Sequence, residues 1–195
     1  MKFHPLLILP IAITALVGCT TIKTESSTST KINHGVPGGE VVQTTKIRAT
    51  VTGIDTANRK ITLVTPDGQK LKVIAGPEVV NFNQIRIGDQ LKVTLTEQLV
   101  VRMAKPGEKT QDGGAALVGL APVGAKPGVV TADTYQTTAT VTGIDTKNHK
   151  ATLKFADGTS KKVTVRQDVD LTKRKVGEKV VIRATEVFAV LIEKP

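Results

Sequence analysis

Residues 50–68 read TVTGIDTANRKITLVTPDG, and residues 140–158 read TVTGIDTKNHKATLKFADG. Both stretches keep the same Gly, Ile, Asp, Asn and Lys residues and the closing Asp-Gly. A second pair of matching stretches follows, RIGDQLKVTLTEQLVV from Arg86 and KVGEKVVIRATEVFAV from Lys175. Matches that recur at a nearly fixed spacing indicate a duplication. The chain of 195 residues therefore contains two copies of one unit.

Within each copy, apolar and polar residues alternate along the chain. Leu91, Val93 and Leu95 alternate with Lys and Thr residues, and the alternation resumes over 99–103. A period of two is typical of strands with one buried and one solvent-exposed face. No segment shows a comparable helical period. The pattern predicts an all-β protein with five strands in each copy, of which 91–95 and 99–103 are the last two in the first copy.

Five short strands in each copy favour a small closed barrel, because closure removes the unpaired edges of a sheet. The connection before the fourth strand contains Phe82, Ile85 and Ile87 in the first copy, and Leu171 and Val176 in the second. We expect these side chains to plug one end of each barrel. The predicted fold is two tandem five-stranded small β-barrels, OB-like or SH3-like, after a signal peptide and a flexible tether.

The composition of the remaining segments completes this organisation. Ser, Thr and Gly dominate the tether, and Gly, Pro and Ala dominate the segment between the copies, as in flexible linkers. The apolar stretch 115–120 leaves open an additional edge strand, although a mobile linker is favoured. The predicted parts are a signal peptide (1–18), a tether (19–40), a first barrel (41–104), a linker (105–128) and a second barrel (129–195).

The first residues have the pattern of an export signal. Lys2 is followed by the apolar run PLLILPIAITALVG, which is shorter than the roughly 20 residues of a membrane-spanning helix. The run ends in LVGC at Cys19, which resembles the lipobox of bacterial lipoproteins. This resemblance implies cleavage before Cys19 and lipidation of its sulfur. Thr20, in place of the Asp that retains many such proteins at the inner membrane, favours the periplasmic face of the outer membrane.

The two copies carry a wider resemblance. Their shared pattern TVTGID…N.K.TL…DG behind a lipobox is similar to bacterial periplasmic lipoproteins with tandem small-barrel repeats. The resemblance covers about two thirds of the chain. It implies architecture and a place in the cell envelope, and it implies no activity.

The residues that both copies keep are those that set backbone geometry. A glycine late in a strand indicates a β-bulge, Asp and Asn side chains stabilise turns, Asn tolerates a left-handed backbone, and Asp-Gly is a strong hairpin signal. A catalytic pair formed by Asp55 and Asp145 would need the two carboxylates within about 5–10 Å, which separate barrels do not favour. The predicted structural turn residues are Gly53, Asp55, Asn58, Asp67, Gly68, Gly143, Asp145, Asn148, Asp157 and Gly158.

Residue types that support catalysis or metal binding are few. After the signal only His34 and His149 remain, and Cys19 is the single cysteine. Nucleophilic catalysis needs a nucleophile beside a base, and soft metals need several ligands together. A basic barrel that binds single-stranded nucleic acid needs aromatic side chains on which the bases stack. Aromatic residues make up only 3% of this chain. We therefore expect no enzymatic activity, no cofactor, no metal and no nucleic-acid partner.

The net charge is +10, and the densest cationic clusters lie in the second copy. Lysines on exposed strands discourage edge pairing, and this explanation competes with a surface that attracts anionic partners. The candidate anion-binding residues are Lys161, Lys162, Lys173, Arg174 and Lys175.

Together these patterns predict a non-enzymatic, lipid-anchored cell-envelope protein that acts as a binding or structural-interaction module. Its expected partners are the membrane, through the anchor, and an envelope protein or an anionic polymer or lipid. The alternative is a periplasmic small-ligand sensor or carrier that uses a barrel mouth. A deep cavity favours the alternative, and filled barrels with a charged stripe favour the first hypothesis.

Overall fold

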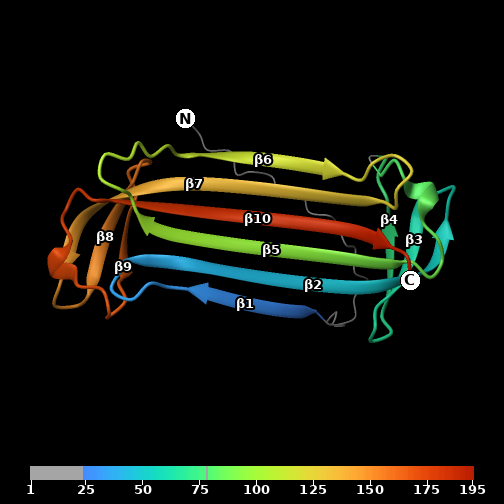
Figure 1. Cartoon of the computed structure of the whole chain (residues 1–195), viewed down its shortest axis with the longest axis horizontal. Coiled ribbons are helices and arrows are strands. Elements are labelled where there is room, and N and C mark those ends of the chain that lie inside the picture. Colours follow the sequence, from blue (N-terminus) through green and yellow to red (C-terminus); the bar gives the residue numbers. More distant parts are fainter. Residues whose placement is uncertain (1–23, 78) are drawn as a thin grey trace.

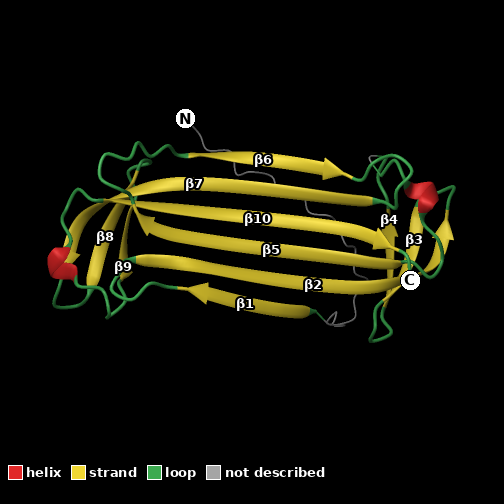
Figure 2. Ribbon diagram, in the orientation of Figure 1, coloured by secondary structure: helices red, strands yellow, loops and turns green. Residues whose placement is uncertain are grey.

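The computed structural model describes residues 24–77 and 79–195, and it shows an open antiparallel sheet of ten strands with two 3-10 helices (Figures 1 and 2). The prediction of an all-β protein is confirmed. The signal peptide (1–18) and Cys19 lie outside the described residues. The elements are β1 (Glu25–Lys31), β2 (Gly38–Asp55), β3 (Lys60–Val64), β4 (Lys70–Ile74), η1 (Phe82–Gln84), β5 (Gln90–Met103), β6 (Gly113–Leu120), β7 (Gly128–Asp145), β8 (Lys150–Phe155), β9 (Ser160–Thr164), η2 (Leu171–Lys173) and β10 (Lys179–Glu193).

Four long strands form the middle of the sheet, in the order β2-β5-β10-β7. β1 pairs with β2 and β6 pairs with β7, so these two short strands border the middle of the sheet (Figure 1). β3 and β4 lie at one end of the long strands, and β8 and β9 lie at the other. Two separate closed barrels are not confirmed, because the strands of both copies belong to one continuous open sheet.

The continuity of the sheet comes from two strands that are longer than predicted. The predicted strands 91–95 and 99–103 are a single strand, β5, and β10 is its equivalent in the second copy. The residues between the two predicted strands, Thr96-Glu97-Gln98, include no Gly, Pro, Asn or Asp that would turn the chain. β5 and β10 pair antiparallel from Gln90↔Glu193 to Met103↔Val180 and thereby join the copies.

Strands also form in the segments that the sequence predicts to be flexible. β1 lies within the predicted tether, and β6 lies within the predicted linker. β6 covers the apolar stretch that left open an edge strand. β1 and β6 are equivalent parts of the two copies, because each precedes and pairs with one of the matching long strands, β2 or β7.

The connection between β1 and β2 lies against the far end of the sheet, which the second copy forms. The guanidinium group of Arg166 donates to the backbone carbonyls of Asn33 at 3.1 Å and Val36 at 2.9 Å. The carboxylate of Asp168 accepts a 2.8 Å bond from the backbone N–H of Gly35. Residues of the second copy therefore hold a connection that precedes the first.

The connection between β6 and β7 lies in the same way against the end that the first copy forms. The side-chain amide of Asn81 donates to the carbonyl of Pro122 at 2.8 Å. Lys126 forms a 2.5 Å ion pair with Asp89, whose side chain is 2% exposed. Each copy thus closes the end of the other, an exchange that two independent barrels would not make.

Each end of the sheet has its own core. In the first copy Phe82 and Ile85 are buried, together with residues of β2 and β3. Leu171 is their buried counterpart in the second copy. Ile87 and Val176 were expected to join these plugs, but they are 68% and 63% exposed. Both follow the 3-10 turn, after the chain has already turned away from the core.

Candidate functional site

The repeated motif builds the same irregular hairpin at both ends of the sheet. The register of β2 with β3 shifts between Val51 and Gly53, and that of β7 with β8 shifts between Val141 and Gly143. A Cβ atom at Gly143 would lie 3.3 Å from the Thr152 hydroxyl oxygen, so a larger residue would crowd the bulge. The two glycines thus mark the position where each long strand bends.

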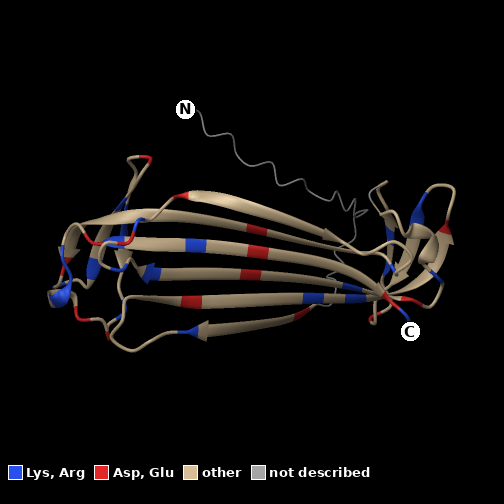
Figure 3. Ribbon diagram, turned by 45° about the horizontal axis from the view of Figure 1, so that its top comes forward, with Lys and Arg blue, Asp and Glu red and all other residues tan. Residues whose placement is uncertain are grey.

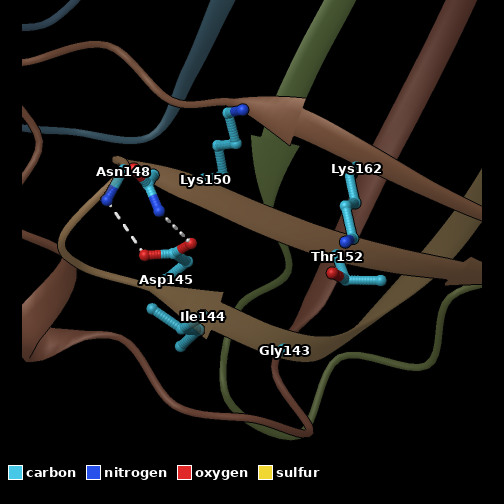
Figure 4. A pocket seen from close by; sticks show the side chains of 7 residues that line it. All are labelled: Gly143, Ile144, Asp145, Asn148, Lys150, Thr152 and Lys162. Carbon is cyan, nitrogen blue, oxygen red and sulfur yellow. Dashed lines mark hydrogen bonds between the residues drawn. The ribbon is translucent and has the colours of Figure 1, made fainter.

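The Asp residues that follow are held in their own turns. Asp145 accepts bonds from the backbone N–H of Asn148 at 2.9 Å and from its side-chain amide at 2.8 Å (Figure 4). Asp55 makes the same two bonds with Asn58, at 3.1 Å and 2.8 Å. This is the geometry that the turn interpretation predicts. The two carboxylates lie at opposite ends of the long strands (Figure 1).

The left-handed residue of each turn differs from the prediction. The positive φ angles belong to Arg59 (50°) and His149 (55°), each one residue after the expected Asn. The Asn side chain reaches back to the Asp carboxylate instead, so the next residue reverses the chain. His149 contacts the backbone carbonyl of Arg166 at 2.9 Å through Nε2.

The second hairpin turn of each copy is an Asp-Gly turn. Gly68 and Gly158 have φ angles of 85° and 86°, a conformation that glycine adopts without steric cost. Asp157 accepts bonds from the backbone N–H and the hydroxyl of Thr159 at 2.9 Å and 2.7 Å. Asp67 accepts a bond from the hydroxyl of Thr65.

Asp145→Ala should lower the stability of the folded protein at neutral pH. The bonds from Asn148 lower the pKa of the Asp145 carboxyl, and a group whose pKa is lowered by folding stabilises the fold above its unfolded pKa. The difference from wild type should therefore shrink as the pH falls below the ordinary carboxyl pKa. Urea unfolding of both proteins from pH 7 to pH 3 would measure it. A difference that grows on acidification would contradict the turn role.

The predicted anion-binding residues lie on two elements of the second copy, β9 and the segment of η2 with the residues that follow it. Lys161 and Lys162 are exposed on β9, where Lys162 and Asp145 both line a pocket of about 430 Å³ (Figure 4). Lys173 lies 3.3 Å from Asp170, and Arg174 lies 3.7 Å from Glu178. Lys175 is exposed in the connection after η2. Lys173 and Arg174 therefore have carboxylate neighbours that offset part of their positive charge.

An apolar cavity of about 450 Å³ lies at the end of the sheet that the second copy forms. β5 and β10 contribute Val101 and Ile182 to it, and β8 and η2 contribute Leu153 and Leu171. Ile32, from the connection between β1 and β2, also lines the cavity. The volume falls within the range of about 300–1,000 Å³ that is typical of small-molecule sites.

Two side chains that line the cavity are smaller than their equivalents in the first copy. Ala151 and Leu171 line it, and the equivalent residues of the first copy are Ile61 and Phe82. Ile61 is 4% exposed and Phe82 is 2% exposed, within a packed cluster. Protein interiors are normally close-packed. The duplication therefore supplies an internal comparison in which one end is filled and the other is open.

Charged residues at the rim of the cavity are paired within the protein. Arg102 makes bonds of 2.9 Å and 2.6 Å to the two carboxylate oxygens of Glu108, and this lowers the pKa of Glu108 to about 2. The side chain of Arg166 likewise holds the pKa of Asp168 well below its usual value. Both carboxylates are therefore ionised at neutral pH. Their negative charges offset the positive charges of the two arginines at the rim.

Sequence reasoning missed the cavity, although a signal was present. The replacement of Ile61 by Ala151 and of Phe82 by Leu171 is visible once the copies are aligned. The exchange of the β1-β2 connection, which brings Ile32 to the cavity, has no such signal in the sequence.

No family model matches the chain, and no curated protein matches it. Over residues 24–77 and 79–195, none of the helices has the length and apolar character needed to cross a membrane. In the same described ranges no three His, Cys, Asp or Glu side chains are placed to hold a metal ion together.

Proposed function

We propose that the protein is a lipid-anchored binding module of the bacterial cell envelope that acts by binding and not by catalysis. Its ligand site is the apolar cavity in the second copy. The observation that carries this proposal is the open volume of about 450 Å³ at a position that the first copy fills with larger side chains. In this proposal the two ends of the sheet act as barrel-like modules, since each end has a hydrophobic core of its own.

The chemistry of the lining indicates the class of ligand. The walls are mainly Val, Leu and Ile side chains, and the arginines at the rim already have carboxylate partners. An acyl chain gains about 0.8 kcal/mol for each CH₂ group that it buries, and it requires no polar partner. The proposed ligand is therefore an acyl chain or a comparable apolar group. This supports the small-ligand alternative more than the charged-surface hypothesis.

The cavity is tested by filling it with the residues of the first copy. The double variant Ala151→Ile, Leu171→Phe should bind a fluorescent dodecanoate at least about tenfold more weakly than wild type, because the larger side chains occupy the cavity. A tenfold loss of affinity corresponds to about 1.4 kcal/mol of binding free energy. Its stability to urea should be equal or higher, because a void is filled. Fluorescence titration of the full chain would measure the binding.

Lys162→Gln is the matched control, because Lys162 belongs to the same end but does not line the cavity. It should leave dodecanoate binding unchanged. Full-strength binding by the filled variant would contradict the cavity as the site. Loss of binding in the control alone would favour an anionic partner on the exposed lysines, a proposal that the net charge of +10 supports.

The lipid anchor is tested at Cys19. Cys19→Ser should abolish labelling by a fatty-acid precursor and release the protein from the membrane fraction, because the sulfur that carries the diacylglyceryl group is absent. Membrane fractionation and intact mass would measure both effects. A variant that stays membrane-bound with an unchanged lipid content would contradict the anchor, and with it the proposed place at the outer membrane.

A further inference from the structure

β6 borders the middle of the sheet, and no other described strand occupies its outer edge. Within the described residues it pairs only with β7 (Figure 1). All eight residues of the strand, GGAALVGL, are exposed, and none is charged. Leu117 is 72% exposed, Val118 is 69% exposed and Leu120 is 54% exposed. An uncharged apolar edge strand of this kind is a template for pairing with another strand.

The equivalent strand of the other half has a different composition. β1 reads ESSTSTK, with charged residues at both ends and hydroxyl side chains between them. Figure 3 shows charged bands along the long central strands, whereas no residue of β6 itself is charged. Charged and polar residues on an edge strand discourage pairing with other chains. One border of the sheet is therefore protected in this way and the other is not.

The direction of the free backbone groups of β6 follows from its pairing with β7. Ala121, which directly follows the strand, donates its backbone N–H to the carbonyl of Gly128 at 2.9 Å. In an antiparallel pair the hydrogen-bonded positions alternate, so the odd-numbered residues of β6 bond to β7. The residues that direct their N–H and C=O groups to the open edge are Gly114, Ala116, Val118 and Leu120.

We propose that β6 is a dimerisation strand, through which two copies of this chain pair antiparallel about a two-fold axis at Leu117. In this register Gly114 of one chain faces Leu120 of the other chain, and Ala116 faces Val118 of the other chain. A small residue thus lies opposite a large one at each of these positions. The free N–H and C=O groups of both edges meet in hydrogen-bonded pairs, and the sheet continues across the axis.

A second molecule of the same chain suits this edge in charge as well as in shape. Like charges directly opposite each other destabilise paired strands, and β6 has no charge to oppose its own copy. The pairing also covers Leu117, which has 72% of its surface in contact with solvent. An isologous pair closes after two chains, so it yields a dimer and not a filament.

The axis residue provides a direct test. Leu117 of the two copies would occupy a non-hydrogen-bonded pair, in which the Cα atoms are about 4.5 Å apart, within the span of a disulfide. The full-length chain with Leu117→Cys, in envelope membranes treated with a mild oxidant, should therefore form a dimer that a reductant dissociates. Ser29→Cys, at the equivalent position of β1, is the matched control and should form at least about fivefold less dimer. The wild-type chain reports any contribution from Cys19.

A second variant separates pairing from chance collision. Val118→Lys places a charge on the open edge, and in the Leu117→Cys background it should remove most of the disulfide dimer. Val118 is exposed, so the circular dichroism spectrum and unfolding curve should not change. Equal crosslinking in Ser29→Cys, persistence of the dimer with Val118→Lys, or a ladder of larger species would overturn the two-fold pairing.

Discussion

Residues 24–108 alone and residues 109–195 alone are expected not to fold as monomers, whereas a mixture of the two fragments should assemble. β5 and β10 are the central strands of the sheet, and their pairing from Gln90↔Glu193 to Met103↔Val180 joins the copies. Separation would expose this pair of edges along the whole length. Each half would also lose the connection that closes its end, including the ion pair of Asp89 with Lys126.

Circular dichroism, NMR dispersion and sedimentation of each fragment would measure this effect. If the first half folds at all, we expect it to fold as a homodimer. The duplication makes β5 equivalent to β10, so β5 of a second fragment molecule could take the place of β10. The full chain, cut between β5 and β6 after folding, is the control and should stay assembled. A monomeric fragment with dispersed signals and cooperative unfolding would show that the copies are independent barrels.

Leu63→Ala should cost more stability than Leu153→Ala, although the two leucines are equivalent in the duplication. Leu63 is fully buried within the packed cluster of the first copy. Leu153 is 7% exposed and lines the open cavity. Leu→Ala in a packed core costs about 2–5 kcal/mol, and the cost depends on how closely neighbouring atoms surround the leucine and on the void that its removal leaves. We expect a value near the upper half of this range for Leu63 and near its lower end for Leu153.

Urea unfolding of both variants and of the wild type would measure the two costs. The comparison needs no outside reference, because one substitution is made twice in one protein at matched positions. Equal costs would mean that the second core is packed as tightly as the first, and the cavity would then lose its role as a site. A larger cost at Leu153 would contradict the cavity more directly.

Local geometry could be predicted from the sequence because short-range interactions determine it. Asp145 and Asn148 are three positions apart, so their turn requires no contact from elsewhere in the chain. Gly158 reverses the chain through its own φ angle. The left-handed residue differed from expectation in both turns, because Arg59 and His149 adopt this conformation one position after the expected Asn.

The sequence by itself determined the all-β class, the duplication and the turns, because alternation, repetition and turn chemistry are local or periodic properties. The tertiary structure decided that β5 and β10 are continuous and paired, and that each copy closes the other. These outcomes depend on contacts between residues distant in the sequence, 41 positions apart for Asn81 with Pro122 and 130 for Arg166 with Val36. No pattern within either copy encodes such contacts, since pairing between copies competes with closure of each copy on itself.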